Sequence, residues 1–276
     1  NDSLLRSMPE GLIDPEVSLV SFWNNDIPLA VLSFYATHPQ SYYLTKTANP
    51  DFPGIARYLR QLAVPDALHV HFNGAGGNIA AGKYNDGSHE TRLILAERLA
   101  DGMERAWRST KKHQVGPEDL GWETENLFLP YQEKVKEIEK TMFQMNSRLL
   151  ANNLGRLGWY KRRIAGKGIE TACLRIHDAR ILLFVEYQLA AKKMAPDHFV
   201  AMAAYGDYGP FYIGTEEAYK EGGYEIESSP VTYESEKVIL KNIETLLSRS
   251  VSNSSDNHLP FRDQNGEISP VTNQTK

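Results

Sequence analysis

The segment Ala67-Leu-His-Val-His-Phe-Asn-Gly-Ala-Gly-Gly-Asn78 decides the fold, because it joins a strand-like run directly to a glycine-rich loop. From His89 to Trp107, apolar side chains then recur every three or four residues, which predicts a helix. A strand, a loop and a helix in succession form a unit from which α/β proteins are built. We therefore predict an α/β chain with a mixed sheet and flanking helices.

Further strands and helices are predicted on both sides of this segment. Upstream, the apolar runs Val17–Trp23 and Pro28–Ala36 indicate two strands joined by a turn. The polar stretch Lys112–Glu125 is assigned neither a helix nor a strand. The remaining elements are predicted over Ile55–Leu62, Tyr131–Leu150, Leu174–Ile176, Arg180–Phe184, Glu186–Met194, Phe199–Ala204 and Ser235–Leu247. Before Glu186 a strand meets a helix without turn residues, so either this boundary is misplaced or a loop is missing.

The composition is that of a folded protein, and the length suggests one large domain or two small ones. The 276 residues are 41% hydrophobic and carry 30 basic against 35 acidic side chains, which excludes collagen-like and mostly disordered chains. The net charge of −5 argues against nucleic acid as the main partner, and no apolar run is long enough to span a membrane. Cys173 cannot form an internal disulfide, and its apolar surroundings predict a small buried side chain. We expect one α/β domain over residues 1–247 and a polar, flexible tail over 248–276.

Three histidines are candidates for chemistry. His38 ends a predicted strand and precedes Pro39, where a neutral imidazole could bind zinc, act as a general base, or simply cap the strand. His69 and His71 lie two apart in a strand, so their side chains share one face. They could bind a metal, or they could be a half-buried structural pair.

The glycine-rich loop matches neither common nucleotide motif. A dinucleotide fingerprint would need a glycine where Ile79 stands, and a phosphate loop would need a serine or threonine where Tyr84 stands. Glycines still allow a backbone to approach a ligand closely, so we expect this loop to shape a site. A second segment, 205–224, mixes glycines with tyrosines, which can provide flat faces and hydroxyl groups to a substrate. A serine nucleophile elbow is not found.

Taken in order, the motifs of this chain resemble those of the neutral/alkaline non-lysosomal ceramidase family, and of a bacterial branch in particular. The resemblance covers roughly residues 12–247. It rests on these segments: Tyr35-Ala-Thr-His38-Pro39, Asn49-Pro-Asp51-Phe-Pro-Gly54, Asn73-Gly-Ala-Gly-Gly-Asn78, Gly82-Lys-Tyr-Asn-Asp-Gly87, Glu186-Tyr-Gln, Ala204-Tyr-Gly-Asp207, Tyr212 to Glu217, and Gly223-Tyr224-Glu225. Each segment is weak alone, but their order makes the set specific.

The resemblance implies an α/β catalytic domain with one zinc ion held by two histidines, a glutamate and a tyrosine. In that family a serine attacks the substrate amide. Carried over by position, His38 corresponds to a zinc histidine and Tyr212 to the zinc tyrosine. Tyr224 corresponds to a tyrosine near the substrate amide. Glu186 is the nearest carboxylate for the remaining ligand.

The chain departs from the family pattern in several places. The first zinc histidine of the family would lie upstream of Asn1, so the domain is expected to be incomplete at its N-terminus. Ala80 stands where the catalytic serine is expected. The Pro-Gly-Glu turn that carries the family's glutamate is absent near Glu186, and the C-terminal immunoglobulin-like domain is also expected to be absent.

These features lead to two functional hypotheses. The first is a zinc-dependent hydrolase that cleaves an amide or ester by a metal-bound water, with the loop amides and Tyr224 acting on the carbonyl oxygen. The second is a non-catalytic protein that binds a glycan or a lipid headgroup. The catalytic candidates are Tyr224, Asn73 and Asn78, the substrate-binding candidates Tyr205, Tyr208, Gly76 and Gly77, and the metal ligands His38, Tyr212 and Glu186.

The same hypotheses give expectations about position and environment. His38 and Tyr212 should approach each other, whereas His69 and His71 should line or underlie the cleft without a primary role. Ser88 should cap a helix and should not serve as a nucleophile. The family resemblance implies a secreted or periplasmic protein, and it leaves the substrate and the oligomeric state open.

Overall fold

The computed structural model describes three stretches of the chain, residues 3–43, 45–206 and 208–249. The strands are β1 (Ser18–Asn24), β2 (Ile27–Tyr35), β3 (Leu68–Asn73), β4 (Leu120–Leu127), β5 (Ile169–Ile176), β6 (Ala179–Leu183) and β7 (Phe199–Ala203). The α-helices are α1 (Ser3–Ser7), α2 (Asp51–Ala63), α3 (His89–Arg108), α4 (Lys134–Thr141), α5 (Ser147–Ile164), α6 (Gln188–Met194), α7 (Glu216–Glu221), α8 (Tyr224–Ser228) and α9 (Ser235–Ser248). Short 3-10 helices lie at Gly82–Tyr84, Pro117–Asp119 and Met142–Gln144.

The described strands form two mixed sheets, which confirms the predicted α/β class. The first sheet has the order β1-β2-β3, and the second has the order β4-β5-β6-β7. In each sheet the last pair is parallel, β2 with β3 and β6 with β7, and the other pairs are antiparallel. In the first sheet the polypeptide between the two parallel strands contains α2, and in the second sheet it contains α6.

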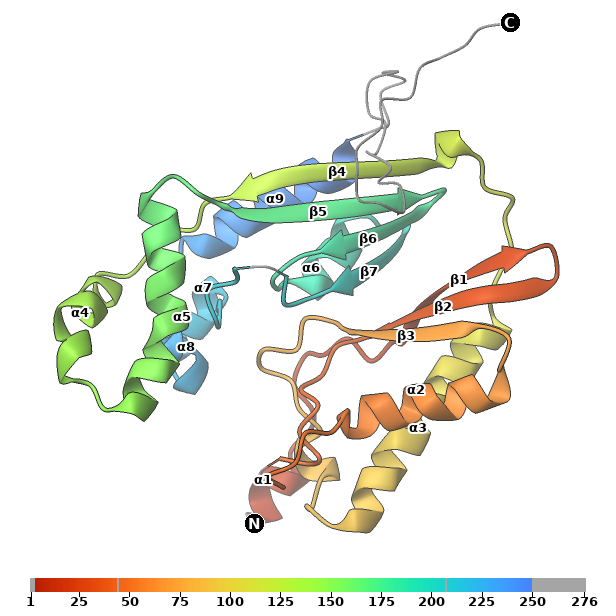
Figure 1. Ribbon diagram of the computed structural model, residues 1–276, viewed down its shortest axis with the longest axis horizontal. Coiled ribbons are helices and arrows are strands. Elements are labelled where there is room, and N and C mark those ends of the chain that lie inside the picture. Colours follow the sequence, from red (N-terminus) through yellow and green to blue (C-terminus); the bar gives the residue numbers. More distant parts are fainter. Residues whose placement is uncertain (1–2, 44, 207, 250–276) are drawn as a thin grey trace, which may run out of the picture.

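The two sheets pack against each other and have helices on their outer faces (Figure 1). Alternation along β6 explains this arrangement, because successive side chains of a strand point to opposite faces. Ile181 packs between the sheets with Phe34 and Ala201, whereas Leu182 packs in the cluster that contains Ile243 of α9. On the other side of the molecule, α2 and α3 pack together against the first sheet.

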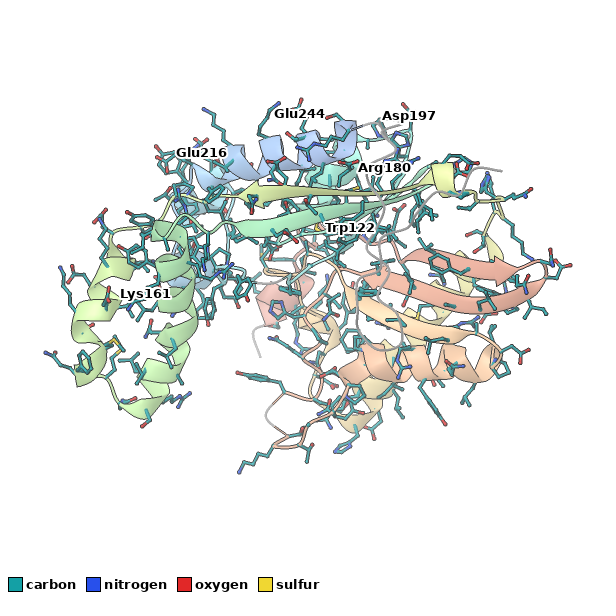
Figure 2. The ribbon with its side chains drawn as sticks, turned by 45° about the horizontal axis from the view of Figure 1, so that its top comes forward. Trp122, Lys161, Arg180, Asp197, Glu216 and Glu244 are labelled. Atoms are coloured by element: carbon teal, nitrogen blue, oxygen red, sulfur yellow. The ribbon has the colours of Figure 1, made fainter. Side chains whose placement is uncertain are left out.

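The exposed helices carry much of the charge. Lys161 on α5, Glu216 at the start of α7 and Glu244 on α9 are all exposed (Figure 2). Each takes part in an ion pair on the surface, where such pairs stabilise a fold by at most about 1 kcal/mol. The core packing therefore carries the fold, and none of the described helices is long and apolar enough to cross a membrane.

Two predictions of secondary structure are wrong. The helix predicted over Tyr131–Leu150 is split, because the Asn146 side chain accepts a hydrogen bond from Leu149 N at 2.9 Å and starts α5 as a new helix. The stretch Lys112–Glu125, to which no element was assigned, contains most of β4. This strand is polar and lies at the edge of its sheet, so it lacks the apolar run by which strands are recognised.

Other elements differ from the predictions at their ends. The helix predicted from Ile55 begins at Asp51, because proline is tolerated in the first helical turn. The abrupt junction before Glu186 was a misplaced boundary. The strand ends at Leu183 and α6 begins at Gln188, so four residues make the turn.

Cys173 is buried as predicted, with 1% of its surface exposed. Burial raises the pKa of its thiol to about 11, which keeps it protonated and unreactive at neutral pH. The predicted tail lies almost entirely outside the described residues, which end at Arg249.

Candidate functional site

The candidate site lies where the carboxyl ends of the parallel strands of both sheets meet. Main-chain hydrogen bonds connect these ends: Ala204 N donates to Asn73 O at 2.9 Å, and Phe184 N donates to Ala203 O at 3.1 Å. The loops after β2, β3, β6 and β7 therefore gather at one edge. In α/β proteins this edge is the usual place for a ligand.

His38 is fixed against the glycine-rich loop. Its main-chain N–H donates to Ile79 O at 2.7 Å, and it forms a parallel bridge with Ala80. Its Nδ1 contacts the Gly76 carbonyl oxygen. Because a carbonyl only accepts, Nδ1 must carry the proton, which leaves Nε2 with a free lone pair. This is how metal-binding histidines are usually oriented.

Glu186 lies on the other side of the same peptide unit. It belongs to the turn between β6 and α6, and an added Cβ on Gly77 would lie less than 3.0 Å from its Oε1. Burial raises the pKa of Glu186 to about 7, and the Gly77 N–H opposes this shift. The Gly76 carbonyl thus faces His38, and the Gly77 N–H faces Glu186. A single peptide bond positions both side chains.

Two tyrosines lie against this peptide unit, and a third packs on one of them. The Gly77 position is within van der Waals reach of Tyr212, whose ring packs edge-to-face on Tyr224 with centroids 5.7 Å apart. Gly76 N donates to the Tyr205 hydroxyl at 3.3 Å. The Tyr205 ring is half exposed, but desolvation of its hydroxyl group and the nearby Glu186 charge raise its pKa to about 12. Desolvation also raises the pKa of Tyr212.

The aromatic residues near the site have an unusual backbone. Positive φ angles occur at Tyr187 (75°), Tyr205 (63°), Tyr208 (63°) and Phe211 (61°). Bulky residues rarely adopt this region, and such strain tends to cluster at functional sites. The loop after β7 is held by cation–π contacts: the Arg162 guanidinium lies 3.6 Å from the Tyr208 ring centroid.

The remaining predicted residues occupy different positions. Asn78 is exposed, Ala80 pairs with His38, and Tyr224 is exposed beside Tyr212. Asn73 lines a cavity between β3 and α2. Ser88 is the N-cap of α3, as predicted, because its Oγ accepts from Thr91 N at 3.2 Å.

One residue that joins the loop to the core was not predicted from the sequence. Gln188 is 5% exposed; its Oε1 accepts from Ala75 N at 3.0 Å and its Nε2 donates to Asp14 Oδ2 at 2.5 Å. Asp14 in turn pairs with Lys192 at 2.8 Å. Gln188 occurs in the Glu186-Tyr-Gln segment, but the pattern gave no indication that its partners lie so far away in sequence.

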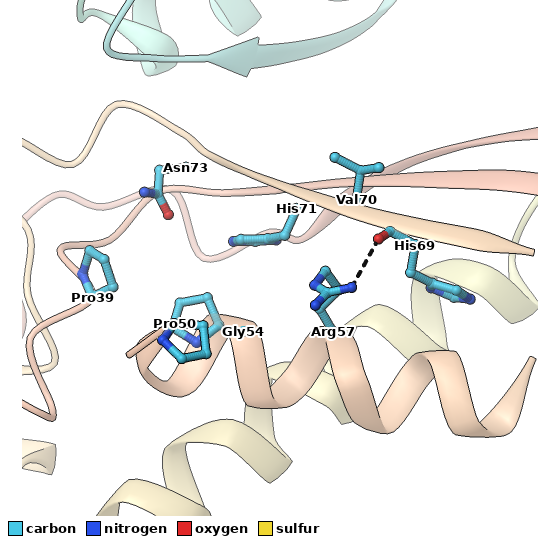
Figure 3. Close-up of a pocket in the computed structure, with 9 residues that line it drawn as sticks. Pro39, Pro50, Gly54, Arg57, His69, Val70, His71 and Asn73 are labelled. Carbon is cyan, nitrogen blue, oxygen red and sulfur yellow. Dashed lines mark hydrogen bonds between the residues drawn. The ribbon is translucent and has the colours of Figure 1, made fainter. Parts of the chain in front are cut away.

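His69 and His71 lie on the α2 side of β3, in the cavity that Asn73 also lines (Figure 3). The structure brings them together with Arg57, and it gives them no contact with His38. The described residues contain no group of three or more histidine, cysteine, aspartate or glutamate side chains that could hold a metal. A metal site here therefore depends on Tyr212 as a ligand beside His38 and Glu186.

Acid should destabilise the protein through His71. Burial, helped by the Arg57 charge, lowers the pKa of His71 to about 4, whereas an unfolded histidine titrates near 6.5. The stability that neutral His71 contributes is complete above pH 6.5 and is lost as the pH falls through 4, a change on the order of 3 kcal/mol. Urea denaturation at several pH values should show that the free energy of unfolding falls less steeply with decreasing pH in His71→Gln than in wild type. His89→Gln, which removes an exposed histidine, is the control, and parallel curves for wild type and His71→Gln would refute the prediction.

Comparison with known proteins supports the fold. No family model and no curated protein sequence matches the chain. Among solved structures it is similar to the neutral ceramidase from Pseudomonas aeruginosa, with a TM-score of 0.61 and 14% identity over 89% of this chain and 50% of that one. It is also similar to a ceramidase complexed with C2, with a TM-score of 0.62 and 13% identity over 85% of this chain and 48% of that one.

The similarity establishes a ceramidase-like fold and no more, because the sequences are so different. It agrees with the resemblance inferred from the ordered motifs. The chain spans about half the length of the ceramidase structures it matches.

Proposed function

We propose that the protein is a zinc-dependent hydrolase that cleaves an amide or ester bond. The observation that carries this proposal is the Gly76–Gly77 peptide unit, which holds a histidine on its carbonyl side and a half-buried, desolvated carboxylate on its N–H side. Among the described residues, Glu186 has no cationic partner. Desolvating a charged carboxylate without a counter-charge is costly, and a bound cation would offset that cost.

The available donors fit zinc in their chemistry. Zinc accepts imidazole nitrogen and carboxylate oxygen in a site of four ligands. His38 would bind through Nε2, Glu186 through its carboxylate, and Tyr212 through its phenol oxygen. Because the pKa of Tyr212 is raised, its phenol needs a nearby cation to ionise. The family resemblance assigns the fourth protein ligand to a second histidine.

When bound, zinc would supply Lewis acidity and lower the pKa of a coordinated water to about 7. The chain itself offers one clear donor for a developing oxyanion. The other N–H groups of the loop are engaged: those of Gly74, Ala75, Gly76 and Ile79 by hydrogen bonds, and that of Gly77 by Glu186. In this proposal exposed Asn78 would be the residue that donates to a substrate carbonyl, through its main-chain N–H, its side-chain amide or both.

Other residues have positioning roles in this proposal. Tyr224 would orient the substrate beside Tyr212. Asn73 would donate to a part of the substrate that reaches the adjoining cavity between β3 and α2. Tyr205, Tyr208 and the glycines of the loop would contact the rest of the substrate. Ala80, which pairs with His38, has no hydroxyl group, so this position cannot form an acyl-enzyme intermediate.

Zinc content tests the proposal directly. We expect about one zinc per full chain, and more than 100-fold weaker zinc binding in His38→Ala and Glu186→Gln, since even residues that only support a ligand contribute 10–100-fold. Tyr224→Phe is the matched control, because it keeps the aromatic contact and removes no proposed ligand. Metal analysis and competition with a chelator give the affinities. A wild-type protein that binds no zinc after loading would contradict the proposal.

A binding protein without catalysis is the second candidate. Exposed aromatic rings at Tyr205, Tyr208, Phe211 and Tyr224 favour it, because flat aromatic faces suit the apolar face of a sugar or a lipid headgroup. Absence of zinc from wild-type protein, with retained binding of a glycan or lipid headgroup, would favour this second function.

A further inference from the structure

The face of β3 turned toward α2 is polar where an apolar face is expected. His69, His71 and Asn73 lie two residues apart and share this face. On the opposite face, Phe72 stacks on Phe34 with ring centroids 5.2 Å apart. A strand beneath a helix normally packs apolar side chains against it. The polar row instead borders a cavity of about 410 Å³, which is large enough for a small ligand (Figure 3).

Two imidazole nitrogens at this cavity lack partners. Both Nε2 atoms, of His69 and of His71, are buried without a hydrogen bond. His69 is 6% exposed, and the ring of His71 is fixed by a hydrogen bond of 2.9 Å between its Nδ1 and Ser33 Oγ. Buried polar atoms are nearly always paired, so each exception needs an explanation. A ligand that hydrogen-bonds to these rings would provide one.

The cavity also contains a cation without a counter-charge. The Arg57 guanidinium donates to His69 O at 3.3 Å, and no described carboxylate lies within ion-pair distance of it. Arg60, one turn later on α2, is paired with Glu104 at 3.2 Å. Asp51, at the start of α2, is engaged by the N–H and hydroxyl groups of the preceding loop. The charge of Arg57 is therefore available to a ligand.

We propose that this cavity is an anion-binding subsite, in which Arg57 holds a carboxylate or phosphate group and His71 and Asn73 add hydrogen bonds. The planar fork of an arginine matches two oxygens of either anion. The prolines and glycine that line the rest of the cavity carry no charge that would repel an anion.

The position of the cavity suggests what the anion belongs to. Pro39 follows His38 directly, and Asn73 precedes the glycine-rich loop, so the cavity adjoins the candidate zinc site. The subsite would then bind the charged substituent of a substrate whose scissile bond lies near Glu186. This second step rests on the proposed function, whereas anion binding itself does not.

Titration of the full chain with inorganic phosphate and, separately, with acetate tests the subsite. We expect saturable changes in the imidazole NMR signals of His71. The anion that binds more tightly shows whether the subsite prefers a phosphate or a carboxylate group. Arg57→Gln should weaken binding about tenfold or more, because it removes a charge-assisted pair. Arg98→Gln, an exposed arginine on α3, should leave it unchanged.

Two results would overturn the subsite. One is that neither anion changes the His71 NMR signals of the wild-type protein in a saturable way. This result does not depend on whether a variant folds. The other is equal affinity in wild type and in a folded Arg57→Gln. Zinc content is measured separately, so a failure of the anion subsite can be distinguished from a failure of the proposed hydrolase.

Discussion

Gly76→Ala should strongly destabilise the protein, whereas Gly77→Ala should preserve the fold and disrupt the candidate zinc site. An added Cβ on Gly76 would lie 2.9 Å from the main-chain N and C atoms of Thr37. The backbone there cannot move easily, since the neighbouring His38 N–H is bonded to the loop at 2.7 Å. We expect a loss of about 3 kcal/mol or more, as for other overpacked core positions.

The neighbouring glycine faces a side chain and not the backbone. A Cβ on Gly77 would meet the end of the Glu186 carboxylate, which can rotate away, and it would make ordinary contact with Tyr212 at 3.6 Å. We expect Gly77→Ala to remain within about 1 kcal/mol of wild type in stability. Its zinc affinity should fall at least about tenfold, because the rotated carboxylate no longer points at the metal.

Urea denaturation and zinc competition measure the two effects on the same proteins. Gly158→Ala is the control, because this glycine of α5 has open space around it and alanine favours a helix by about 1 kcal/mol. If Gly76→Ala were as stable as wild type, the close packing of the loop against Thr37 would be wrong. If Gly77→Ala kept full zinc affinity, Glu186 would not be a ligand.

The fold was predictable where side-chain periodicity reflects burial. The strands beside the glycine-rich loop are rich in apolar residues and the following helix repeats them every three or four residues, and their predicted bounds agree with the structure to within one or two residues. Polar β4 gave no such signal because it lies at a sheet edge. The division between α4 and α5 depends on the cap at Asn146, a local hydrogen bond that apolar periodicity does not reveal.

The candidate site was predictable only in part. Strand ends and the family resemblance led to His38, Glu186 and Tyr212, which the structure places around one peptide unit. Long-range partners could not be predicted. Gln188 lies 174 residues from Asp14 in the sequence, and nothing in either segment indicates that they are bonded.

Removing the side-chain amide of Gln188 should lower the stability of the protein and weaken zinc binding at the candidate site. Gln188→Leu keeps a similar volume, but it leaves Ala75 N without an acceptor and buried Asp14 without one of its donors. The orphaned Ala75 N–H costs roughly 1–3 kcal/mol, and Asp14, which keeps its pair with Lys192, loses one further hydrogen bond, so we expect a total loss of about 2–4 kcal/mol.

The same substitution should weaken zinc binding, because Ala75 begins the stretch of loop that carries the Gly76–Gly77 peptide unit. Denaturation in urea and zinc competition should therefore change together in Gln188→Leu. Gln40→Leu, at an exposed glutamine, controls for the change of residue type. Asp14→Asn separates the hydrogen bond with Gln188 from the ion pair with Lys192. The asparagine keeps an oxygen that can accept from the Gln188 amide, but it removes the charge that pairs with Lys192 at 2.8 Å. A loss of less than about 1 kcal/mol in Gln188→Leu would show that the loop is held by other contacts, since an orphaned buried N–H and a lost hydrogen bond to Asp14 together cost more than that.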